Sequence, residues 1–278
     1  MLKTRIITAI VLAAGFMAVL FMGTEPYWTL GMLAVSLLGV YEWGGLAKLT
    51  QNQRYVYVLI AAIAGFVCAT WMLHIVAAYG YTALLHKPGR ILYVAAAFWL
   101  LVVPIWLKTR YVLNNKFLMC LLGLFLMFSL WLAFVFAKAL SPWSLLSILA
   151  TIWIADSAAY FTGKKFGKHK LAPNISPGKT WEGVFGALAG VTLFGLVLYF
   201  YFGIYNAPLV FGGLWGISIL GVMGDLFESM MKRQANIKDS GCILPGHGGI
   251  LDRVDGIISS LPIAILVILT YFADSFIH

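Results

Sequence analysis

Long, uninterrupted apolar stretches recur along the whole of this 278-residue chain and restrict it to one class of fold. A helix needs about 20 apolar residues to cross the roughly 30 Å hydrocarbon core of a membrane. Candidate spans cover residues 6–22, 28–47, 56–80, 91–107, 117–137, 143–163, 183–204, 208–224 and 256–273. The apolar residues are continuous and do not alternate with polar ones, which argues against a β-barrel. We therefore expect an all-α, polytopic integral membrane protein with about nine transmembrane helices.

The composition excludes the main alternative classes. Hydrophobic residues make up 62% of the chain and charged residues 10%, whereas about 25% of the residues in soluble domains are charged. Three cysteines in 278 residues cannot form the framework of a disulfide-rich secreted scaffold. A water-soluble enzyme is thus excluded.

Two details of the first and third spans stay open. Apolar character continues past residue 80 to Leu85, so residues 56–85 form either one long tilted helix or a helix followed by a re-entrant segment. Lys3 and Arg5 precede the first apolar stretch as they would in a signal peptide, but no small-x-small cleavage site follows it. We expect a retained signal anchor.

The positions of the basic residues orient the spans. With nine spans and a cytoplasmic N-terminus, Lys87, Arg90 and Lys138 are the only ones of the 19 lysines and arginines that fall on the far side. A different number of spans would destroy this asymmetry. The net charge of +9 is therefore mainly a signal of topology, with some attraction to anionic lipid head groups, and does not indicate nucleic-acid binding.

Acidic residues are concentrated in the second half of the chain. Residues 1–140 contain two of the ten, Glu25 and Glu42, whereas most of the others fall between residues 156 and 255. We interpret residues 1–140 as a membrane scaffold. Residues 141–278 are interpreted as a catalytic region with cytoplasmic loops at 164–182 and 225–255.

Several of these carboxylates lie at the ends of apolar stretches or inside them. A carboxylate at the centre of a bilayer costs about 2.5–3.5 kcal/mol on insertion scales, so it is usually paired or bound to a ligand. Asp225 ends one apolar stretch, and Asp252 and Asp255 precede another on one helical turn. Their oxygens suit a hard divalent cation. The simpler alternative is a set of salt bridges with neighbouring lysines and arginines at the membrane surface.

The two polar loops also carry groups that suit phosphate. Gly248 and Gly249 allow backbone N–H groups to approach an anion closely. The stretch from Ser176 to Thr180 has a lysine beside glycine, but it lacks the spacing of a phosphate-binding P-loop. Four lysines in the first loop are explained by contact with anionic lipid: Lys164, Lys165, Lys168 and Lys170.

Two motifs in these loops resemble a known family. Residues 229–255 read S-M-M-K-R, four residues, K-D-S-G, two residues, then L-P-G-H-G-G-I-L-D-R-V-D. This run closely resembles the signature of the phosphatidate cytidylyltransferases (CDP-diacylglycerol synthases). Residues 176–183, S-P-G-K-T-W-E-G, are similar to a second loop motif of that family. The resemblance rests on residues 156–256, since the first 140 residues show apolar stretches but no motif.

The resemblance implies an activity and its requirements. These enzymes transfer CMP from CTP to phosphatidate, release pyrophosphate, depend on Mg²⁺ held by aspartates and act as dimers in the membrane. We accordingly expect a homodimer with its contacts in the scaffold, in the inner membrane of a bacterium, with the active site facing the cytoplasm. A second cation is compatible with this chemistry.

The residues and the resemblance together suggest roles. The expected metal ligands are Asp225, Asp252 and Asp255. The expected substrate-binding residues are Ser176, Lys179, Thr180, Gly248 and Gly249. The expected catalytic residues, mostly clamps for phosphate groups, are Lys232, Arg233, Lys238, Asp239, His247 and Arg253. Asp156 is a further candidate, either as a ligand or as the partner of a lysine.

Other functions remain as alternatives. A CTP-dependent kinase acting on a polyprenol-type lipid would use related chemistry but release CDP in place of pyrophosphate. A transporter would distribute polar residues through the bilayer midplane, whereas here they gather at one face. The D-G-x-x-A-R pattern of CDP-alcohol phosphotransferases does not occur in the sequence.

Overall fold

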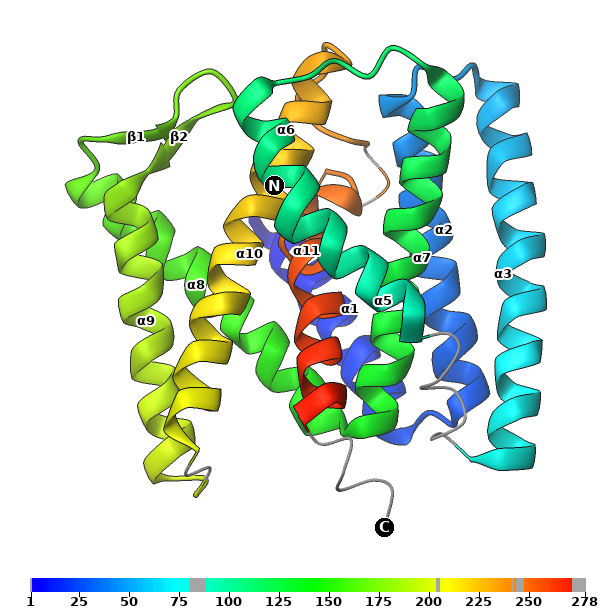
Figure 1. Cartoon of the computed structure of the whole chain (residues 1–278), viewed down its shortest axis with the longest axis horizontal. Helices are drawn as coiled ribbons and strands as arrows, with labels where there is room; N and C mark the ends of the chain where they lie inside the picture. Colours follow the sequence, from blue (N-terminus) through cyan, green and yellow to red (C-terminus); the bar gives the residue numbers. More distant parts are fainter. Residues whose placement is uncertain (1, 81–88, 204–205, 242, 244–247, 272–278) are drawn as a thin grey trace.

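Helices account for almost all of the described chain. The structure, a computed structural model, describes residues 2–80, 89–203, 206–241, 243 and 248–271 (Figure 1). The first helices are α1 (Leu2–Met22), α2 (Glu25–Leu46) and α3 (Gln51–Tyr79). One continuous helical segment follows, made of α5 (Gly89–Ala97), the π-helical turn η1 (Phe98–Val102) and α6 (Val103–Thr109). The rest are α7 (Lys116–Leu140), α8 (Pro142–Phe166), α9 (Trp181–Phe200), α10 (Ala207–Gln234) and α11 (Leu251–Tyr271).

The membrane fold expected from hydropathy is confirmed. Within the described residues, eight helices are long and apolar enough to cross a membrane, and α1 contributes a shorter apolar stretch, Ala13–Met22. Buried backbone groups in lipid must find their partners inside the same segment, which makes a helix the default for an apolar stretch. The orientation of the N-terminus stays a prediction.

The third span is a single helix as far as it is described. Helix α3 runs from Gln51 to Tyr79, begins with a capping box at Thr50 and Gln53, and ends at Gly80 with φ of 76°. Of the two readings of residues 56–85, the helix accounts for all residues up to 79. Residues 81–88 lie outside the described part of the chain.

The polar loops hold more regular structure than the sequence indicated. Helix α10 continues ten residues beyond the expected end at 224, because Phe227, Met230 and Met231 keep an apolar face packed in the core. Strands β1 (Lys170–Ala172) and β2 (Ser176–Thr180) form an antiparallel hairpin with Lys170 opposite Thr180. The hairpin is an addition to the all-α expectation.

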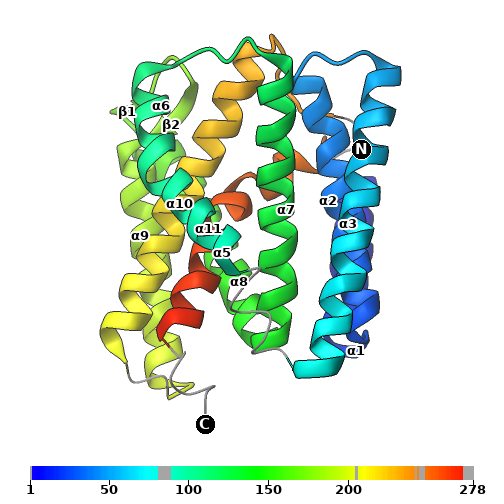
Figure 2. The same cartoon turned by 45° about the vertical axis from the view of Figure 1, so that its right-hand side comes forward.

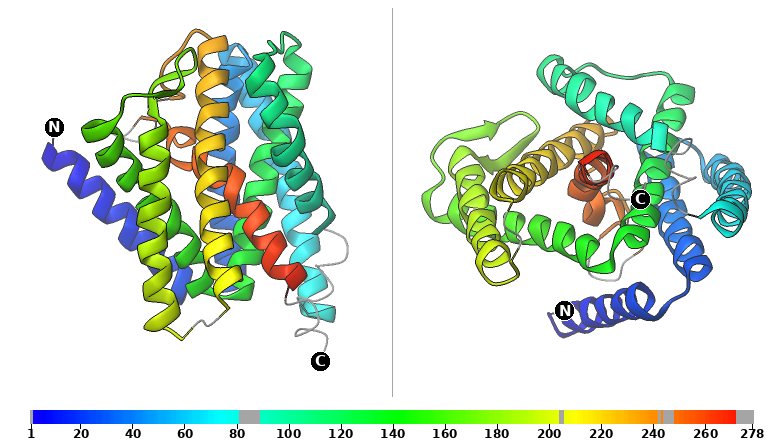
Figure 3. Two further views of the ribbon diagram at one scale, coloured as in Figure 1. Left: turned by 60° about the vertical axis from the view of Figure 1, so that its left-hand side comes forward. Right: turned by 60° about the horizontal axis from the view of Figure 1, so that its bottom comes forward.

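The helices form a bundle around α7 and α11. Both of these helices bury most of their side chains, and the view from below shows α11 at the centre (Figure 3, right). Helix α3 stands at the edge of the bundle (Figure 2). It exposes apolar residues such as Leu59, Ile63 and Phe66. Such an apolar outer face suits contact with lipid. The hairpin and the ends of α2, α6 and α10 lie together at the top of Figure 1.

Helices α10 and α11 approach each other through small residues. A Cβ atom on Gly224 would collide with the backbone oxygen of Asp255 and with the hydroxyl of Ser259. Ser259 Oγ donates to the carbonyl of Leu220 at 2.7 Å, a hydrogen bond between the two helices. Small residues and serine hydroxyls are typical of close helix contacts in membranes. This crossing brings Asp225 near the first turn of α11.

We predict that Gly224→Ala destabilises the protein. The added methyl group must push α11 away, and overpacking of this kind costs about 1–3 kcal/mol. The midpoint of thermal unfolding in detergent, followed by tryptophan fluorescence, should fall. Gly216→Ala is the matched control, since a Cβ on Gly216 of the same helix meets no described atom within 4 Å. Equal midpoints for the two variants would contradict the close crossing.

Candidate active site

An ion pair joins the two polar loops. The Nζ of Lys179, in β2, contacts Oδ2 of Asp225, in α10. The other oxygen of Asp225, Oδ1, accepts a hydrogen bond from Ser229 Oγ at 3.2 Å. The two regions carrying the sequence motifs therefore meet at one end of the bundle.

A cavity of about 450 Å³ lies beside this ion pair. Its polar lining comes from Asp156 of α8, from Ser176, Lys179 and Thr180 of the hairpin, and from Asp225 of α10. A volume in this range is typical of small-molecule sites. The hairpin is fixed to α9, because Thr180 Oγ1 accepts a hydrogen bond from the N–H of Gly183 at 3.1 Å.

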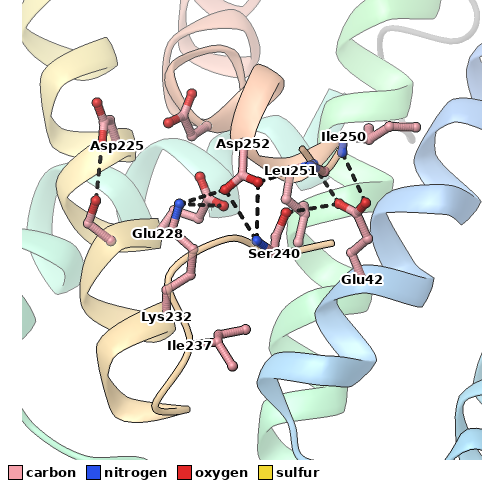
Figure 4. A network of polar contacts seen from close by, with 12 residues as sticks. Glu42, Asp225, Glu228, Lys232, Ile237, Ser240, Ile250, Leu251 and Asp252 are labelled. Carbon is pink, nitrogen blue, oxygen red and sulfur yellow. Dashed lines mark hydrogen bonds and ion pairs between the residues drawn. The ribbon is translucent and has the colours of Figure 1, made fainter. Parts of the chain in front are cut away.

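A second polar cluster surrounds Asp252 at the start of α11 (Figure 4). Oδ1 accepts a hydrogen bond from Lys232 Nζ at 2.7 Å. Oδ2 accepts hydrogen bonds from the backbone N–H groups of Ser240 at 3.1 Å and Gly249 at 3.0 Å. Lys232 Nζ also lies 3.4 Å from Oε1 of Glu228. Both oxygens of Asp252 are thus held by the protein itself.

Negative charge exceeds positive charge in this region. Asp156, Asp225 and Asp255 interact electrostatically with one another, with Lys179 as their cationic neighbour. Glu228 is 3% exposed, and neither of its carboxylate oxygens has a hydrogen-bond partner among the described residues. Since Oε1 is paired with Lys232 Nζ at 3.4 Å, Oε2 is the buried oxygen left without a partner among the described residues, and such an oxygen suits a cation. The donor set therefore fits a hard divalent cation such as Mg²⁺.

This is not a complete metal cage. Within the described residues, no group of three or more His, Cys, Asp or Glu side chains is arranged to hold a metal ion. Mg²⁺ is commonly bound through one or two carboxylates together with substrate phosphates. The arrangement is consistent with a cation site that substrate phosphates complete.

The structure brings some of the expected site residues together and leaves others apart. Ser176, Lys179, Thr180 and Asp225 share the cavity, and Lys232, Gly249 and Asp252 share the second cluster. The N–H of Gly249 donates to Asp252, where we had expected it to face a phosphate. Gly248 adopts a φ of 82°, a left-handed conformation that glycine tolerates.

Of the remaining expected catalytic residues, four are exposed and one lies outside the described chain. Arg233 is exposed, and its Nη1 donates to the carbonyl of Ile237 at 3.4 Å. Lys238, Asp239 and Arg253 are also exposed. His247 lies outside the described residues.

Glu42 is not among the site residues expected from the sequence. This residue of α2 is 2% exposed, and its carboxylate accepts hydrogen bonds from Ser240 and from the first turn of α11. The available signal was a carboxylate inside the apolar stretch 28–47, the same signal that drew attention to Asp156.

The fold and the site define a helical membrane protein with a charged cavity of small-molecule size at one end. Residues 3–271 match the family model described as Cytidylyltransferase family. The chain is 34% identical to the phosphatidate cytidylyltransferase of Haemophilus influenzae, over 94% of this chain and 96% of that protein. It is 35% identical to the enzyme of the same name from Pseudomonas aeruginosa, with 95% of each chain covered. For the one from Thermotoga maritima the identity is 33%, with 96% of each chain covered. The chain therefore belongs to the phosphatidate cytidylyltransferase family.

Proposed function

We propose that this protein transfers CMP from CTP to phosphatidate in the cavity between α8, α10 and the hairpin. The products are CDP-diacylglycerol and pyrophosphate. The observation that carries the proposal is the Lys179–Asp225 ion pair, which joins the two regions that carry the family motifs beside a cavity of about 450 Å³. Full-length similarity to phosphatidate cytidylyltransferases supports the same reaction.

The acceptor needs little activation. A phosphate monoester has a second pKa near 6, so phosphatidate is largely dianionic at neutral pH and already nucleophilic. One of its oxygens attacks the α-phosphorus of CTP, and the bond from that phosphorus to the bridging oxygen of the β-phosphate breaks. No covalent enzyme intermediate is required. The protein must hold two anionic reactants together and stabilise the charge that develops on pyrophosphate.

The side chains in the two clusters divide this work. Lys179 and Lys232 provide cationic groups for phosphates, and Ser176 and Thr180 line the cavity around them. Asp225, Asp252 and Asp255 are the proposed holders of Mg²⁺, with the carboxyl groups of Asp156 and Glu228 nearby. When bound, the cation would neutralise phosphate oxygens and so favour departure of pyrophosphate.

The outer residues complete the proposal. The exposed groups Arg233, Lys238, Asp239 and Arg253 bind the incoming nucleotide in this proposal, together with Gly248 and with His247, which lies outside the described residues. Gly249 is buried and supports Asp252 through its N–H instead. The site faces the cytoplasm of a bacterial cell, where CTP is available. Residues 1–140 form the scaffold and the contacts of a homodimer, and residues 141–278 carry the catalytic groups.

The position of a radioactive label tests the reaction. Purified protein with Mg²⁺, in micelles that contain phosphatidate and a polyprenol-type lipid, receives CTP labelled either at the α- or at the γ-phosphate. We expect the α-label in the lipid and the γ-label in pyrophosphate. Transfer of the γ-label to a polyprenol-type lipid, with release of CDP, would instead identify the CTP-dependent lipid kinase and overturn the proposal.

A further inference from the structure

Glu42 is a buried carboxylate far in sequence from both motifs. It lies on α2 and is 2% exposed. A buried ionised group is costly unless hydrogen bonds compensate its lost hydration. Its Oε1 accepts from the N–H of Ile250 at 3.0 Å, and its Oε2 accepts from the N–H of Leu251 at 2.9 Å. Ser240 Oγ donates to Oε2 at 3.0 Å.

These donors belong to the start of α11 and the segment before it. Leu251 is the first residue of α11, so its N–H and that of Ile250 are among the groups that a helix start leaves without internal partners. A carboxylate there also interacts favourably with the positive end of the helix dipole. Glu42 thus caps α11 from a different helix.

Two glycines beside Glu42 leave room for its carboxylate. A Cβ on Gly241 would collide with Glu42 Oε1, and one on Gly249 would collide with Glu42 Oε2 and with the Ser240 hydroxyl. Two glycines of the motif at residues 229–255 therefore have a steric role towards α2. That role explains Gly249 better than a phosphate contact does, since its N–H already donates to Asp252.

Glu42 and Asp252 hold the same segment from opposite sides (Figure 4). Ser240 donates its hydroxyl to Glu42 and its backbone N–H to Asp252. Leu251 donates to Glu42 and directly precedes Asp252. Any shift of the α11 start relative to α2 must therefore move the carboxylate of Asp252.

We propose that Glu42 is a positioning residue, which fixes the start of α11 and thereby the carboxylate of Asp252 for catalysis. It does not touch the substrate in this role. The inference rests on the proposed function, because the proposed function assigns Asp252 to the cation and phosphate site. It also gives α2, in the first half of the chain, a supporting part in the active site.

The test measures both hydrogen exchange and activity in a variant whose side chain at position 42 carries no charge. Glu42→Gln preserves the size of the side chain but replaces one acceptor oxygen by a donor. Hydrogen exchange, measured without substrate or Mg²⁺, should become at least about tenfold faster at Ile250 and Leu251, with little change in α7. In the label-transfer assay, the Mg²⁺ concentration for half-maximal rate should rise several-fold. Loss of folded molecules alone would lower the rate without shifting that concentration.

Matched variants complete the experiment. Glu25→Gln alters the other acidic residue of α2, at the opposite end of the helix, and should leave both measurements unchanged. Ser240→Ala removes one donor to Glu42 but keeps the backbone contact to Asp252, so it should give a smaller shift of the same kind. If Glu42→Gln does not fold, the measurements on Ser240→Ala test the proposal.

Exchange rates and Mg²⁺ dependence equal to wild type in these variants would overturn the proposal. Absence of label transfer by the wild-type protein would instead disprove the proposed function, while the exchange measurement would still test the cap.

Discussion

Asp252→Asn is expected to reduce label transfer from CTP to phosphatidate by at least about a thousandfold at saturating Mg²⁺. The side chain accepts hydrogen bonds from Lys232, Ser240 and Gly249. An asparagine keeps one acceptor oxygen and places an NH₂ group against donors. It also removes the negative charge that pairs with Lys232 and that we assign to the cation site.

The measurement needs a check on folding. Rates should be determined on protein that elutes as a single species and retains its thermal unfolding midpoint to within a few degrees. Glu25→Gln is a suitable control, because it also replaces a carboxylate by an amide. Glu25 lies at the start of α2, at the end of that helix away from Glu42 and the Asp252 cluster. If folded Asp252→Asn retains activity within about tenfold of wild type, Asp252 is not part of the catalytic machinery.

Hydropathy was sufficient to predict the helices but not their ends in the polar loops. The extension of α10 to Gln234 depends on Phe227, Met230 and Met231, which pack inside the core only in the folded chain. The hairpin at 170–180 is equally hidden, because strands of three and five residues are too short for a periodic pattern. Local composition identified both regions as polar and nothing more.

The site was predictable as a set of residue types, but its connections were not. Asp225 and Lys179 stand out in sequence, and their ion pair follows once the loops meet. Two of the partners of Asp252 are backbone N–H groups, which no side-chain pattern reveals. Glu42 lies 198 residues from Ser240 in the chain, so only the packing of α2 against the rest of the bundle brings the two together.

The ion pair of Lys179 and Asp225 leads to the second large effect. We expect Lys179→Met and Asp225→Asn each to lower kcat/KM for CTP by at least about a hundredfold. In the proposed reaction Lys179 holds a phosphate and Asp225 holds the cation, so each residue has a task beyond pairing with the other. Lys165→Met is the matched control: Lys165 is exposed at the same end of the molecule, outside the cavity lining, and its loss should change the rate by less than about twofold.

The double variant Lys179→Met/Asp225→Asn separates catalysis from structure. If the pair only held the hairpin on α10, each single variant would suffer mainly from an unpaired charge, and neutralising both would restore activity. If the two residues bind substrate and cation, as proposed, the double variant should be no more active than the weaker single variant. Steady-state label transfer for wild type, both single variants and the double variant measures this. Recovery of the double variant to within about tenfold of wild type would show that the ion pair is structural. The cation and phosphate site would then have to lie around Asp252 and Lys232 alone.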